Sequence, residues 1–177
     1  MASSVDQFNL ACNHIVGLLQ DASRLLEASS HATSTFLSIT ALEETSKIYM
    51  GMYRKSAEAV KRSKDPLYKH SEKHRIAVGP TVAMGHRLQS AIGEARMNEL
   101  IELARSGGLI GVRESALYAE QQNNKLNVPR EVISPSTARD MLLLAVEAFD
   151  DCLVGYTARS NDLSNQTDAI FAHWKSA

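Results

Sequence analysis

The feature that most constrains the fold is a largely apolar segment from Ala32 to Tyr53 that carries two adjacent acids and a lysine near its centre. At helical spacing its apolar residues fall on most sides, which is typical of a helix buried inside a bundle. A carboxylate on such a helix is unfavourable unless it is paired or hydrogen-bonded. Glu43, Glu44 and Lys47 therefore need partners in the folded protein.

Two interpretations of these charges are open. Glu43 and Lys47 lie four residues apart with the acid first, which is the favourable order for an ion pair on one helix. Such a pair would only hold the helix in place within the core. In the other interpretation, the charges form a polar site inside the bundle. The segment by itself does not choose between a structural and a functional role.

Composition narrows the class of protein. The 177 residues include few aromatic residues, Gly or Pro, and this favours helix over strand. A net charge of −1 gives no general sign of a nucleic-acid or membrane surface. We recognise neither a signal peptide nor an apolar run long enough to span a bilayer. Cys12 and Cys152 lie far apart on apolar stripes, which favours buried thiols in a reduced, cytoplasmic protein.

Hydrophobic periodicity divides the chain into expected helices. These span residues 5–29, 32–64, 66–78, 84–105, 138–160 and 163–174. From Leu109 to Ser136 the period is lost, and we expect a long loop with a short ordered piece near residues 113–120. A loop of this length inside a compact domain is often functional. The prediction is a single all-α domain, residues 1–177, of about five or six helices.

A second set of polar residues follows the central segment. His70 and His74 lie one helical turn apart with Lys73 close by. If their helix packs beside the central one, acids, lysines and imidazoles converge. Such a cluster suits acid–base chemistry on a phosphodiester, because His exchanges protons and Lys offsets phosphate charge.

The alternative for this cluster is a metal held by His70, His74 and one of the acids. A di-iron bundle would need Glu-x-x-His motifs on two helices, and the sequence has none. It also lacks a Gly-rich phosphate loop, a nucleophile elbow and zinc-finger spacing. We therefore expect neither a metal nor another cofactor.

The run LLQDASRLLEASSHATSTFLSITALEETSKIYMGM is similar to a known family pattern. In that pattern a helix with LLxDAxxLL is followed by a break, then by small and apolar residues that lead into an EE-x-x-K signature. The signature here is Glu43, Glu44 and Lys47. On these residues the chain resembles the AbiV family of phage abortive-infection proteins.

Two further motifs of the family follow in order. A His-x-x-Lys motif appears here at residues 70–73. A motif like LYVD before a proline appears as LYAE at residues 117–120, ahead of Pro129, with Ala and Glu in place of Val and Asp. The order and spacing agree over about residues 10–135, which is most of the chain.

The AbiV family is grouped with HEPN domains, and the resemblance implies a HEPN-like helical bundle of a kind that often dimerises and often cuts RNA. HEPN ribonucleases usually carry an Arg-x(4–6)-His motif. Arg24 and His31 fit that spacing, but a chain with this composition contains roughly one such pair by chance. Ribonuclease activity is therefore implied by the relatives and not by a motif.

The resemblance favours a cytoplasmic phage-defence protein that acts on RNA, such as tRNA or mRNA, as a metal-independent ribonuclease. In this hypothesis His70 is the acid–base residue. Lys47 and Lys73 stabilise phosphate charge, and Glu43 or Glu44 positions them.

The alternative hypothesis is a non-enzymatic binding module that recognises a phage or host protein through residues 109–136. Arg113, Tyr118 and His74 are the expected contacts with RNA or with such a partner. A phage-encoded trigger protein is a further expected partner.

Two helices carry more apolar residues than one stripe requires, and this predicts a homodimer. The alternative is that both helices are central in the core of one chain. The residues concerned are Leu10, Ile15, Val16, Leu18, Leu19, Leu25 and Leu26 in the first helix, and Leu142, Leu143, Val146 and Leu153 near the end of the chain.

Overall fold

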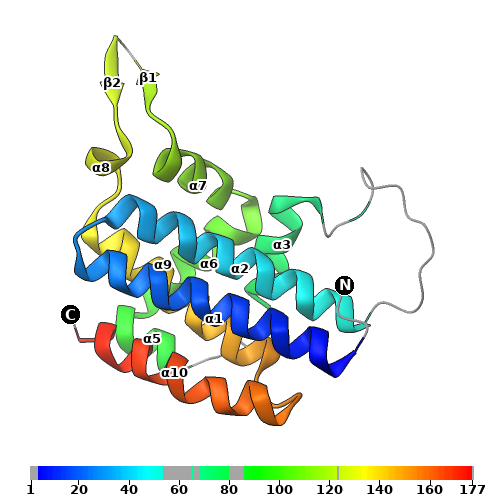
Figure 1. The fold of residues 1–177 in the computed structure, drawn as a ribbon. Helices are drawn as coiled ribbons and strands as arrows, with labels where there is room; N and C mark the ends of the chain where they lie inside the picture. The colour runs from blue at the N-terminus through cyan, green and yellow to red at the C-terminus, as the bar shows by residue number, and fades with distance from the viewer. Residues whose placement is uncertain (1–3, 54–64, 66–67, 80–85, 123, 177) are drawn as a thin grey trace.

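The computed structural model describes residues 4–53, 65, 68–79, 86–122 and 124–176 (Figure 1). Two long helices, α1 (Val5–Glu27) and α2 (His31–Tyr53), pack against each other as an antiparallel pair. α1 begins where the Ser4 hydroxyl accepts a hydrogen bond from the Gln7 amide, as expected of an N-cap serine. The expected break after the first helix is confirmed, and Ser29 adopts a left-handed φ of 57° in it.

Helix α9 (Pro135–Leu153) forms the centre of the core and contacts α1, α2, α5 and α10. Ser134 caps it by accepting a hydrogen bond from the Thr137 amide, and Pro135 occupies its first position. Its apolar residues are buried on all sides. Fully buried residues include Leu142, Leu143, Leu144, Val146, Phe149 and Leu153.

The burial of α9 removes one argument for a dimer. Leu142, Leu143 and Leu153 have no exposed surface in the single chain, so their apolar character needs no second subunit to explain it. The inference of a subunit interface from α9 was wrong, because this helix has neighbours on every side. On α1, Ile15, Val16, Leu19 and Leu26 are buried as well, but Leu10 remains 70% exposed.

Helices α3 (His70–Ala77), α5 (His86–Ile92) and α6 (Glu94–Ser106) cover another side of the bundle, with α3 between α2 and α6. One helix was expected over residues 84–105, but the chain breaks at Gly93, whose φ is +83°. Glycine adopts this conformation without the steric cost of a Cβ atom, so the break divides the helix in two.

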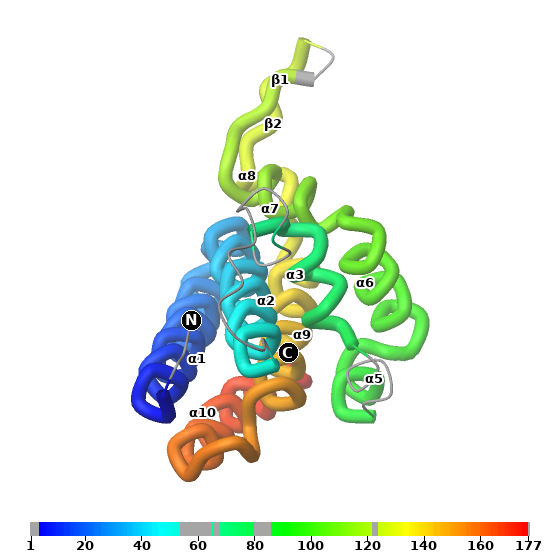
Figure 2. Tube along the Cα trace, turned by 90° about the vertical axis from the view of Figure 1, so that its right-hand side faces the viewer, coloured from blue at the N-terminus to red at the C-terminus, as the bar shows by residue number. Residues whose placement is uncertain are grey.

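The expected short ordered piece near residues 113–120 is present, but the expectation that the rest of residues 109–136 forms a long loop was wrong. This stretch forms α7 (Leu109–Leu117), a hairpin of β1 (Glu120–Gln122) and β2 (Lys125–Asn127), and α8 (Pro129–Val132). The strands pair antiparallel with Gln121 opposite Leu126. Both are short and polar, so they give almost no alternating pattern for sequence reasoning to detect. The hairpin projects away from the bundle (Figures 1 and 2).

The C-terminal helix α10 (Ala158–Trp174) begins earlier than expected, and α9 does not run on to residue 160. Gly155 at φ +96° turns the chain. Thr157 and Ser160 then form a reciprocal capping box at the start of α10. At the far end, the Trp174 indole donates a hydrogen bond to the Ser23 hydroxyl at 2.8 Å, which anchors α10 on α1.

The all-α expectation is confirmed, although the expected five or six helices are too few. The described residues form nine helices, because Gly93 divides one expected helix and the supposed loop holds two more. The expected continuation of α2 to residue 64 and the expected start of the next helix at residue 66 lie outside the described residues. Within the described ranges, no helix is long and apolar enough to cross a bilayer.

Candidate functional site

The candidate site lies where α3 packs against α2. Ser46 on α2 fixes this contact, because its hydroxyl donates to the backbone carbonyl of Lys73 at 2.6 Å. Small buried residues such as Ser38 and Ala41 give α2 little side-chain bulk. Sequence reasoning did not select Ser46. The signal was a series of small polar residues along a buried helix, which favours close approach of neighbouring backbones.

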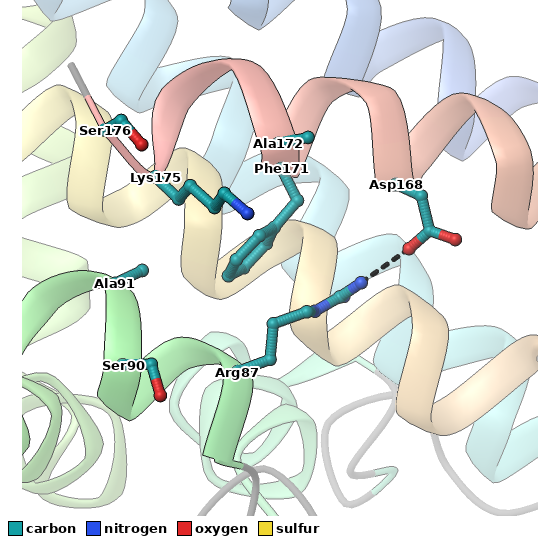
Figure 3. Close-up of a pocket in the computed structure, with 8 residues that line it drawn as sticks. All are labelled: Arg87, Ser90, Ala91, Asp168, Phe171, Ala172, Lys175 and Ser176. Carbon is teal, nitrogen blue, oxygen red and sulfur yellow. Dashed lines mark hydrogen bonds and ion pairs between the residues drawn. The ribbon is translucent and has the colours of Figure 1, made fainter.

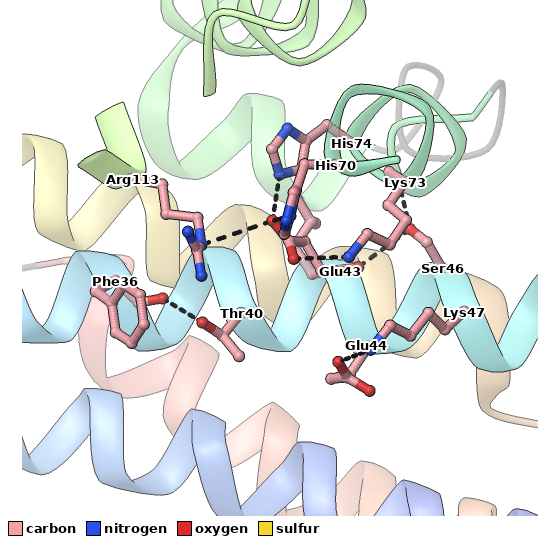
Figure 4. Close-up of polar contacts among 11 residues, drawn as sticks. Phe36, Thr40, Glu43, Glu44, Ser46, Lys47, His70, Lys73, His74 and Arg113 are labelled. Carbon is pink, nitrogen blue, oxygen red and sulfur yellow. Dashed lines mark hydrogen bonds and ion pairs between the residues drawn. The ribbon is translucent and has the colours of Figure 1, made fainter. Parts of the chain in front are cut away.

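Glu43 is the hub of this site, and its carboxylate is 5% exposed. Its Oε1 accepts hydrogen bonds from His70 Nδ1 at 2.8 Å and from His74 Nε2 at 2.9 Å. Its Oε2 accepts one from Lys73 Nζ at 2.9 Å (Figure 4). Of the polar residues predicted from the two segments, Glu43, His70, Lys73 and His74 therefore do converge. They surround one carboxylate that contacts three residues of α3.

The surroundings of Glu43 keep it ionised. Burial alone would raise the pKa of this carboxyl, but hydrogen bonds from His74, Lys73 and His70 outweigh burial and lower the pKa to about 2. Because an ionised carboxylate only accepts hydrogen bonds, the imidazole nitrogens that face it must carry protons. The Nδ1 of His70 is therefore the protonated nitrogen, and its Nε2 points away from Glu43.

The three α3 residues differ in exposure, and this separates their roles. The side chain of His70 is 45% exposed, whereas that of Lys73 is 4% exposed and that of His74 is fully buried. Only His70 can meet a large molecule from solvent. Lys73 and His74 therefore hold the carboxylate from inside, and His70 lies at the rim.

Arg113 on α7 completes the site from the other side. Its Nε lies 3.8 Å from Glu43 Oε1, and its guanidinium lies over the ring of Phe36, 5.0 Å from the ring centroid. This Nε is buried and has no hydrogen-bond partner in the described part of the chain. One carboxylate thus faces two basic side chains, Lys73 and Arg113, so basic groups outnumber acidic ones beside His70.

The proposed pairing of Glu43 with Lys47 was wrong. Lys47 instead bonds Glu44, three residues earlier, on the flank of α2 away from the Glu43 cluster (Figure 4). The physical reason is that Glu43 turns into the interface with α3, where several donors compete for it. Both Lys47 and Glu44 remain partly exposed.

Two other sequence candidates lie apart from this cluster. Tyr118 is 62% exposed and ends α7 at the base of the hairpin. Arg24 is exposed on α1 and bonds Asp21 at 2.8 Å. The described contacts of Arg24 therefore do not include His31. Among the residues with described positions, no three side chains of His, Cys, Asp or Glu are arranged to hold a metal ion.

Comparison with known proteins agrees with the motifs from which this site is built. The family model described as AbiV matches residues 4–149, which is most of the chain and includes every member of the Glu43 cluster. The chain belongs to the AbiV family. No curated protein and no solved structure matches it. Membership gives this AbiV protein a role in phage defence by abortive infection.

A second polar cluster in the AbiV protein surrounds Arg87 on α5 (Figure 3). Its guanidinium donates to Glu147 and Asp150 on α9 and to Asp168 on α10, each at 2.6 Å. It also lies over the ring of Phe171, 4.2 Å from the centroid. A cavity of about 510 Å³ opens beside it. Because the guanidinium is occupied by the protein's own carboxylates, this cluster joins α5 to α9 and α10 instead of offering a free cation.

Asp151 next to this cluster should make stability depend on pH. Burial, and then the charge of Glu147, raise the pKa of Asp151 to about 6 from 3.8. The folded chain therefore holds this proton more tightly than the unfolded chain does, and stability falls as pH rises from about 4 through 6. Asp151→Asn should increase the free energy of unfolding at pH 8 by on the order of 1 kcal/mol and change it little at pH 4.

Thermal unfolding at the two pH values checks this prediction. Asp162→Asn is the matched control, because Asp162 lies exposed on α10, and it should show no such difference. An equal effect of Asp151→Asn at both pH values would contradict the assignment.

Proposed function

We propose that this AbiV protein acts in the cytoplasm as a metal-independent ribonuclease on RNA such as tRNA or mRNA. The observation that carries the proposal is the position of His70. Its Nδ1 is bound to a buried, ionised carboxylate, while the imidazole itself is half-exposed at the rim of a positively charged site. A carboxylate that orients a histidine in this way prepares the opposite ring nitrogen for proton transfer.

The reaction follows from these groups. His70 Nε2 takes the proton of a ribose 2′-hydroxyl as its oxygen attacks the adjacent phosphorus. The P–O5′ bond breaks, and His70 returns the proton to the leaving 5′-oxygen. The products are a 2′,3′-cyclic phosphate and a 5′-hydroxyl end. Arg113 stabilises the negative charge that grows on the phosphate oxygens, which is the effect that electrostatic catalysis requires.

The geometry changes the roles expected of the lysines. Lys73 is buried against Glu43, so we assign it to holding the carboxylate and not to touching RNA. Lys47 is turned away from the cluster with Glu44. Phosphate stabilisation therefore moves from Lys47 and Lys73 to Arg113.

The test is to incubate the purified protein with total RNA and with tRNA in EDTA. The proposal expects cleavage that leaves cyclic-phosphate ends. It also expects an Arg113→Ala variant, confirmed as folded by its helical CD signal, to cleave far more slowly. The absence of cleavage by the wild-type protein, or equal cleavage by both proteins, would overturn it.

A second candidate function is recognition of a phage or host protein. The surface of the hairpin region, from α7 to β2 (residues 109–127), favours it. Large apolar side chains are 42–62% exposed at Leu117, Tyr118 and Leu126, and exposed aromatic and aliphatic groups suit protein contacts. Pull-down from infected cells distinguishes the two functions. A stoichiometric phage-encoded partner that Leu126→Ser releases and His70→Ala retains would favour binding over catalysis.

A homodimer, which the resemblance to HEPN domains implies, would use the exposed face of α1. Leu10 is its most exposed large apolar residue, so Leu10→Asp should split the dimer without unfolding either chain. Light scattering at micromolar concentration should give twice 19.4 kDa for the wild type and one chain for the variant. A wild-type mass of one chain at all concentrations would disprove the dimer.

A further inference from the structure

A cavity of about 810 Å³ opens at the base of the hairpin, between the turn from α1 to α2 and the segments α7 and α8. Its volume lies within the range of about 300–1,000 Å³ that is typical of small-molecule sites. Neither the Glu43 cluster nor the ion pairs of Arg87 include any residue of its lining. It therefore needs an explanation of its own.

The lining of this cavity combines three kinds of group. Arg130 and His31 supply positive or hydrogen-bonding side chains, Ser29 supplies a hydroxyl, and Leu117 and Pro129 supply apolar surface. The first turn of α2 also lines it, and the amides of a first helical turn have no acceptor within their helix. A group that fits has an anionic part and a flat or apolar part, which is the chemistry of a nucleotide.

Two helices, α2 and α7, connect the lining of the cavity to the candidate site. On α2, Ala32 lines the cavity and Phe36 follows one turn later. On α7, Leu117 lines the cavity and Arg113 precedes it by one turn. Phe36 and Arg113 contact each other. Ala32 on α2 and Leu117 on α7 are therefore each one helical turn from this pair.

The distance along α2 sets the spacing between the two sites. Glu43 follows Ala32 by eleven residues on the same helix, which corresponds to about 16 Å at the rise of an α-helix. The cavity and His70 therefore lie too far apart for one nucleotide and within reach of a short strand. Arg113 lies between them.

We propose that this cavity binds a nucleotide of the RNA strand a few positions away from the phosphodiester that is cut beside His70. This inference rests on the proposed function, because it names a subsite of the same substrate. Arg130 contacts the phosphate of the bound nucleotide, and the apolar wall formed by Leu117 and Pro129 contacts its base. The cavity thus fixes which bond of the strand reaches His70.

The experiment measures fluorescence anisotropy of a labelled RNA octamer, with His70→Ala in every protein so that the probe is not cut. Arg130→Ala should weaken binding roughly tenfold, as expected for loss of one charge-assisted hydrogen bond. It should also lower the slope of log affinity against log salt by about 0.7, the value for one phosphate of a single strand. Thr33→Trp, which fills the cavity from an exposed position, should weaken binding without changing that slope.

The control is Arg105→Ala, since Arg105 is exposed on α6 and bonds only Glu102 in the described contacts. Equal losses in the Arg105 and Arg130 variants would show non-specific charge attraction and overturn the proposal. Tight binding of adenosine monophosphate with the same Arg130 dependence would assign the cavity to a free nucleotide and would also overturn it.

Failure of the subsite and failure of the proposed function give different results. If the octamer binds as expected but wild-type protein cuts no RNA, the ribonuclease proposal fails and the subsite stands. If RNA is cut while Arg130→Ala and Thr33→Trp bind and cut like the wild type, the subsite is wrong and the ribonuclease proposal stands.

Discussion

Replacing Glu43 with alanine should lower the free energy of unfolding by about 3–5 kcal/mol, the usual effect of removing one partner from a buried ion pair. The variant leaves Lys73 inside the protein without its carboxylate and leaves His74 Nε2 without its acceptor. Because these groups cannot reach water from their buried positions, the folded state carries the full cost of burying polar groups without partners. Urea denaturation followed by far-UV CD measures the change.

The matched control is Glu44→Ala at the next position of the same helix. Glu44 is partly exposed and bonds only Lys47 among the described contacts, so its removal should change stability by less than about 1 kcal/mol. If the free energy of unfolding falls equally in both variants, Glu43 is not the centre of a buried cluster.

Lowering the pH should also remove the stabilisation that Glu43 provides. The pKa of Glu43 is lowered from 4.5 to about 2 in the folded protein, so its contribution is complete above pH 4.5 and is lost as pH falls towards 2. That shift corresponds to roughly 3 kcal/mol, in agreement with the range expected for Glu43→Ala. The stability of Glu43→Gln should accordingly depend less on pH between 4.5 and 2 than that of the wild type.

Replacing His70 with alanine should slow RNA cleavage by about 10²–10⁴-fold, the usual contribution of a general acid–base residue. His70 is half-exposed and supplies only one of the three hydrogen bonds to Glu43. The variant should therefore keep its helical CD signal and its affinity for an RNA octamer. A loss of rate without a loss of binding is the signature of a group that acts on the chemical step.

His14→Ala provides the comparison for this variant, since His14 is an exposed histidine on α1. Its cleavage rate should equal that of the wild type. If His70→Ala retains the full rate, the site is structural. The binding function of the hairpin region would then be the better account of how this AbiV protein acts in phage defence.

The sequence by itself determined the class of the fold, the family and several of the residues that gather around Glu43. Helical spacing placed Glu43 on a buried helix, where a carboxylate must find partners. The one-turn spacing of His70 and His74 put both on one face of the next helix. These inferences succeeded because they depend on the local periodicity of a helix, which the sequence contains directly.

Only the tertiary structure decided which charges meet. Glu43 bonds Lys73 across two helices and not Lys47 on its own helix, because side chains brought together by packing compete with local pairs. Arg113 joins the site from a segment that showed no helical period. The apolar excess of α9 faces its own chain and not a second subunit. Each of these findings depends on contacts between residues distant in sequence. The local hydrophobic pattern does not indicate such contacts.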